Sequence, residues 1–93
     1  MNVRYRARAL ADIDEIFQFL NERSPTGAAN VLRAIAAAID SVADNPRAAR
    51  RTSDPDIRVK MVGRYRYKIF YSVVEDRYVE IIHVRHAARR PWL

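Results

Sequence analysis

The stretch Tyr65-Arg66-Tyr67-Lys68-Ile69-Phe70-Tyr71-Ser72-Val73 alternates large apolar side chains with mostly polar ones. A period of two is typical of a β-strand that has one buried face. We expect Tyr67, Ile69 and Tyr71 to face the core. The intervening Arg66, Lys68 and Ser72 are then expected to point away from it.

Two further strands are predicted on either side of this stretch. Residues 57–61 alternate in the same way and precede a turn at residues 62–64. Residues 78–84 follow a second turn at residues 75–77, and Val79, Ile81 and His83 are expected to share one face. Because both turns are short, the three strands are predicted to form an antiparallel meander.

The residues before the meander carry a helical period. A short strand over Asn2 to Arg6 is followed from Ala9 to about Arg23 by apolar residues spaced for one helix face, namely Leu10, Ile13, Phe17 and Leu20. A second helix is predicted from Pro25 to about Asp44, because Ser24 can cap its first amides and Pro25 suits the first helical position. Residues 47–56 are expected to form a loop.

This order of elements predicts one α+β domain over residues 1–93, with a helical hairpin packed on one face of the sheet. The length suits a single modest core, and 49% hydrophobic with 30% charged residues is typical of a globular chain. The absence of cysteine excludes disulfides and thiolate metal sites, and it favours a cytoplasmic protein. We expect no cofactor, no metal site and no membrane span.

The positive charge is concentrated in the second part of the sequence. Residues 1–57 hold eight basic and eight acidic residues, whereas residues 58–93 hold nine basic and three acidic, which gives the net charge of +6. We predict a basic face on the open side of the sheet, formed by Arg58, Lys60, Arg66, Lys68 and Arg85. Such a face suits an acidic partner or nucleic acid, although surface cations also simply prevent sheet edges from pairing.

Two histidines and one tryptophan have more than one interpretation. His83 and His86 can act in proton transfer near neutral pH, but residues three apart on a strand point to opposite faces, so a structural role is favoured. No carboxylate lies beside them at metal-ligand spacing. Trp92 either folds back on the core, which we favour, or anchors a partner.

The segments 65–73 and 79–86, together with the opening Ala9-Leu10-Ala11-Asp12-Ile13-Asp14-Glu15-Ile16, resemble the RelE/ParE superfamily of bacterial toxins. The resemblance implies the toxin half of a type II toxin–antitoxin pair. RelE-like members cut mRNA on the ribosome, and ParE-like members are thought to bind DNA gyrase. The chain is more similar to the ParE-like branch, because it lacks the terminal tyrosine that is usual in RelE-like members.

The resemblance leaves three functions to distinguish. The first is a non-enzymatic toxin that binds gyrase. The second is a metal-independent endoribonuclease that acts on the ribosome through Lys60, Lys68, Arg85, His83 and His86. The third is a basic adaptor that binds nucleic acid.

The resemblance also implies a cognate antitoxin, ParD-like or otherwise acidic, through which the complex would bind operator DNA. We expect an acidic amphipathic antitoxin segment whose carboxylates lie over Arg58, Lys60 and Lys68. Its apolar residues would contact a surface formed by Leu10, Ile13, Phe17 and Trp92.

Overall fold

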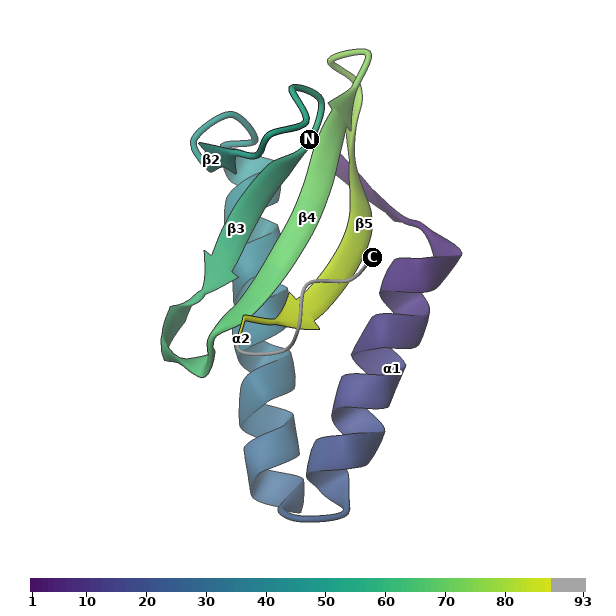
Figure 1. The fold of residues 1–93 in the computed structure, drawn as a ribbon, viewed down its shortest axis with the longest axis vertical. Helices are drawn as coiled ribbons and strands as arrows, with labels where there is room; N and C mark the ends of the chain where they lie inside the picture. The colour runs from purple at the N-terminus through teal and green to yellow at the C-terminus, as the bar shows by residue number, and fades with distance from the viewer. Residues whose placement is uncertain (88–93) are drawn as a thin grey trace.

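The computed structural model describes residues 1–87, which form a five-stranded sheet and a pair of helices (Figure 1). The elements follow one another as β1 (Asn2–Tyr5), α1 (Ala7–Asn21), α2 (Pro25–Asp44), β2 (Arg50–Arg51), β3 (Arg58–Val62), the 3-10 turn η1 (Gly63–Tyr65), β4 (Tyr67–Val74) and β5 (Tyr78–His86). Trp92, for which we predicted a role, lies outside the described residues. No helix of residues 1–87 is both long enough and apolar enough to cross a membrane.

The sheet has the order β1-β5-β4-β3-β2. The predicted meander of β3, β4 and β5 is antiparallel, as expected. Two pairings were not predicted: β1 runs parallel to β5, and the two-residue β2 within the expected loop pairs with β3. The first strand therefore lies beside the last one, and β4 occupies the centre of the sheet.

The two helices form the predicted hairpin and cover one side of the sheet. In Figure 1, α2 passes behind the strands while α1 runs beside β5, and the helices contact β3 and β5 respectively. The predicted bounds of α2 are confirmed, and α1 begins two residues earlier than expected. Ser24 caps α2, because its hydroxyl accepts a hydrogen bond from the Gly27 amide at 3.0 Å.

The core lies between the sheet and the helical hairpin. Tyr67, Ile69 and Tyr71 of β4 are buried there, as the alternation predicts. Apolar residues of the helices and of β5 complete the core, among them Ile35 and Ile81. We call this side of the sheet the helix side and the other the open side.

An irregularity in β5 changes which residues face the core. Phe70 pairs with His83 while the next residue of β4, Tyr71, pairs with Ile81, so Ile82 is an extra residue in β5. A bulge of this kind shifts the alternation of the following residues by one. Val84 is therefore buried on the helix side and His83 pairs on the open side, so the prediction that Val79, Ile81 and His83 share one face was wrong.

Candidate functional site

The predicted basic face is divided by the register of β3. Paired residues of antiparallel strands point to the same side of a sheet, and Arg58 pairs with Tyr71 while Lys60 pairs with Ile69. Both cations therefore lie on the helix side, where Arg58 donates to the Ala49 carbonyl at 2.9 Å. The prediction that they point the same way as Lys68 was wrong.

The apolar residues of β3 explain this reversal. Val59 is buried on the open side opposite Phe70, and it stands apart from the main core. Because β3 lies close to the edge of the sheet, the long stems of Arg58 and Lys60 can run along apolar surface while their charged ends reach water. A cation can thus occupy a position that faces the helical layer.

Arg66 also departs from its predicted place. It lies between η1 and β4 with a left-handed backbone (φ 64°), and the Ala87 amide donates to its carbonyl at 2.7 Å. Arg66 is exposed, but it is not part of the alternating strand. The alternation that predicted its direction therefore begins only at Tyr67.

The open side keeps two of the predicted cations and gains others from the start of the chain. Lys68 and Arg85 are directly opposite each other on β4 and β5. Across β5, Arg4 pairs with Glu80 in register and stacks on Tyr78, with 4.1 Å from its guanidinium carbon to the ring centroid. The sequence contains a signal for these N-terminal cations, because arginine recurs at every second residue from position 4 to position 8.

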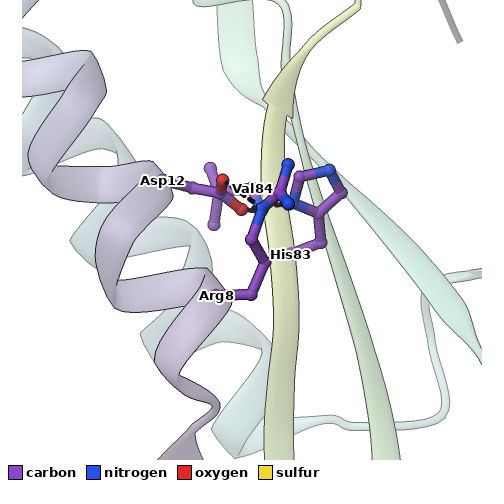
Figure 2. A network of polar contacts seen from close by, with 4 residues as sticks. All are labelled: Arg8, Asp12, His83 and Val84. Atoms are coloured by element: carbon purple, nitrogen blue, oxygen red, sulfur yellow. Dashed lines mark hydrogen bonds and ion pairs between the residues drawn. The ribbon is translucent and has the colours of Figure 1, made fainter. Parts of the chain in front are cut away.

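A buried polar network joins the first helix to the last strand (Figure 2). Asp12 of α1 is 6% exposed, and its Oδ2 accepts from the Val84 amide at 3.0 Å and contacts Nδ1 of His83. Its other oxygen, Oδ1, accepts from Nε of Arg8 at 2.9 Å. The pairing of β1 with β5 ends at Ile81, and beyond it the Asp12 carboxylate accepts the backbone hydrogen bond of Val84 that a neighbouring strand would otherwise accept.

Burial and stacking hold the His83 imidazole in place. The residue is 5% exposed, and its ring stacks on Phe70 with the centroids 6.2 Å apart. Sequence spacing gave no carboxylate partner for this histidine, because Asp12 precedes it by 71 residues. A signal for Asp12 was nevertheless present: it lies three residues after Ala9 and four before Ile16, so it shares their buried helix face.

The two histidines are separated by the sheet. His86 pairs with Tyr67 on the helix side, where the two rings meet edge to face with centroids 5.0 Å apart. His83 pairs on the open side with Phe70. They cannot act on one substrate atom as a paired acid and base.

The predicted antitoxin-contacting residues of α1 differ in exposure. Leu10 is 55% exposed, Phe17 is half-buried, and Ile13 packs against the core. Their role stays a prediction, and Leu10 is the member that offers the most free surface.

Two tyrosines have perturbed acidity. Burial raises the pKa of Tyr71, and the nearby Arg58 opposes that rise. The Tyr71 hydroxyl donates to the Pro46 carbonyl at 2.5 Å. Burial, together with the carboxylate of Asp40, raises the pKa of Tyr5.

Residues 3–91 match the model of a family described as the ParE toxin of the type II toxin–antitoxin system parDE. The chain belongs to this family. Two relatives are similar over most of their length: Y4kP of Sinorhizobium fredii, which is named as a toxin, and toxin RelE2 of Caulobacter vibrioides. Y4kP is 33% identical over 85 residues, which are 91% of this chain and 86% of the relative. RelE2 is 32% identical over 82 residues, which are 88% and 90%.

The fold agrees with that of a solved relative. A chain of the chromosomal ParDE system from P. aeruginosa superposes with a TM-score of 0.79 at 19% identity, over 92% of this toxin and 95% of that chain. The toxin is therefore a type II toxin–antitoxin toxin of the RelE/ParE superfamily. The predicted superfamily and its α+β arrangement are both confirmed.

Proposed function

We propose that the toxin arrests growth by binding DNA gyrase, that it does not cut RNA, and that a ParD-like antitoxin neutralises it. The observation that carries this proposal is the separation of the residues that RNA cleavage would need. Attack of a 2′-hydroxyl on its phosphate uses a base on one side of the phosphorus and an acid on the other. His83, Lys68 and Arg85 are on the open side of the sheet, whereas His86 and Lys60 are on the helix side, so the two histidines cannot form this pair.

The test compares the two targets with one preparation of antitoxin-free toxin. We expect the toxin to inhibit supercoiling of relaxed plasmid by gyrase and to leave mRNA on translating ribosomes intact. Cleaved mRNA together with undisturbed supercoiling would refute the proposal.

Lys68 and Lys60 supply a matched pair of variants for this test. Both lysines are half-buried on neighbouring strands, but they face opposite sides of the sheet. If gyrase docks on the open side, Lys68→Ala should weaken inhibition several-fold, because it removes a charge from the contact. Lys60→Ala should leave inhibition unchanged.

Ribosome-dependent mRNA cleavage is the second candidate, and one observation favours it. The Asp12 carboxylate holds Nδ1 of His83, which is how a carboxylate orients a histidine for proton transfer. If this candidate is right, His83→Gln should lower cleavage by at least about a hundredfold. The thermal midpoint of the variant must be followed in parallel, since His83 is also buried.

A further inference from the structure

A cavity of about 180 Å³ lies between the start of α1 and the bulge of β5, and it is lined by Arg6, Arg8, Ile82 and His83. This cavity has no role in the gyrase binding proposed above. Since one water molecule occupies about 30 Å³ in the liquid, the cavity has room for a carboxylate and part of its aliphatic stem. Its wall combines two guanidinium groups with an apolar isoleucine.

A carboxylate positions each arginine of the cavity and leaves some of the N–H donors of that arginine available. Nη2 of Arg6 lies 3.0 Å from Oε1 of Glu80, and Nε of Arg8 lies 2.9 Å from Oδ1 of Asp12. A guanidinium has five N–H donors, so neither carboxylate uses all of them. The side chains are 52% and 67% exposed, which keeps them accessible to a partner.

The charge around the cavity is positive. Three arginines, Arg4, Arg6 and Arg8, lie near two carboxylates, Glu80 and Asp12, which leaves one net positive charge on these five side chains. Lys68 and Arg85 also lie on the open side and add two more positive charges. The surroundings therefore attract an anion.

We propose that this cavity receives the carboxylate of an aspartate or glutamate side chain of the antitoxin. The donors of Arg6 and Arg8 would bind the carboxylate, and Ile82 would contact the methylene groups of its stem. A single carboxylate suits the cavity better than a nucleic-acid backbone, because Glu80 and Asp12 would repel a continuous row of phosphates. The proposal rests on membership of a toxin–antitoxin family and does not depend on which target the toxin binds.

The site can be tested with a small carboxylate probe, N-acetylglutamate N-methylamide, added to the full chain. The reporter is the Val84 amide signal in a proton–nitrogen NMR spectrum, because this amide donates to Asp12 beside the cavity. We expect a saturable shift of this signal, and no such shift from the uncharged glutamine analogue. An equal response to both compounds would overturn the proposal.

Variants locate the binding within the cavity. Arg6→Gln and Arg8→Gln should each weaken binding about tenfold, as expected for the loss of one charge-assisted hydrogen bond. Arg33→Gln is the matched control, because Arg33 is an exposed arginine of α2 that donates to Asn30. If all three variants bind the probe equally, the assignment to this cavity is wrong.

Two competitors identify the source of the anion. Inorganic phosphate and single-stranded RNA are titrated against the same Val84 signal. Binding of the glutamate compound that survives both competitors supports a protein partner. If RNA displaces the glutamate compound at RNA concentrations below the dissociation constant of that compound, the proposal is overturned in favour of a nucleic-acid phosphate.

Discussion

Asp12 joins α1 to β5 through hydrogen bonds. It is buried, it accepts hydrogen bonds from Arg8 and from the Val84 amide, and it contacts Nδ1 of His83. Replacing it by alanine would leave two buried groups on β5 without their acceptor, and each unsatisfied buried donor costs about 1–3 kcal/mol. We expect Asp12→Ala to lower the free energy of unfolding by about 3 kcal/mol, measured by urea denaturation.

Asp14 provides the control for this prediction. It is an exposed acidic residue of the same helix, two positions further along. Asp14→Ala should change the free energy of unfolding by less than about 0.5 kcal/mol. Equal effects of the two variants would show that the network adds nothing to stability.

Tyr71 makes the folding stability of the protein fall at alkaline pH. Its pKa in the folded protein is raised from the ordinary value of 10.0 by burial. The unfolded chain releases the phenol proton first, so the stability from this group is fully present below pH 10.0 and is lost as the pH rises through the folded value. Tyr5, whose pKa is also raised, contributes with the same sign.

We therefore expect the urea midpoint to fall as the pH rises above about 10. Tyr71→Phe should have a lower midpoint at neutral pH, because the hydrogen bond to Pro46 is lost. The same variant should lose less stability than the parent protein on going to alkaline pH. Parallel pH profiles for the two proteins would contradict this expectation.

At the scale of the element, the cap of α2 is a local signal with a measurable effect. Ser24 accepts from the Gly27 amide, and Ser→Ala changes at N-caps cost about 1 kcal/mol. We expect Ser24→Ala to destabilise the protein by about that amount. Ser41→Ala, at an exposed position near the other end of α2, should have a much smaller effect. Thermal melts of the two variants decide the question.

The alternation of side chains predicts the buried face of β4 but not that of β3, for a physical reason. In the segment 65–73 the apolar side chains stand mostly at odd-numbered positions, which share one face of a strand, so the buried face was predictable. In β3 the odd-numbered and the even-numbered positions both carry side chains that tolerate partial burial. The pairing with β4 therefore decides the direction of Arg58 and Lys60. Alternation alone contains no information about that pairing.

The bulge of β5 was unpredictable for a related reason. The residues Ile81-Ile82-His83-Val84 suit burial on either face of a strand. An extra residue there therefore interrupts no alternation of apolar and polar side chains. The contact of His83 with Asp12 could not be inferred either, because it follows from the packing of α1 beside β5. The candidate site was therefore predicted in its charge but not in its geometry.

At the scale of the whole molecule, the net charge of +6 should control how fast an acidic partner binds. Between about 0.01 M and about 1 M salt the Debye length falls from about 30 Å to about 3 Å. We expect the association rate with the antitoxin to fall at least about tenfold over this range, measured by stopped flow. The dissociation rate should change much less. An association rate independent of salt would show that long-range attraction has no part in recognition.

The parallel pairing of β1 with β5 affects how the toxin is made. Residues 2–5 have their partners at residues 78–81, so β1 cannot join the sheet before residues 78–81 have left the ribosome. The cavity beside β5 includes Ile82 and His83, and it forms only at that late moment. An antitoxin that recognised this cavity would therefore bind only chains in which β5 has already been synthesised.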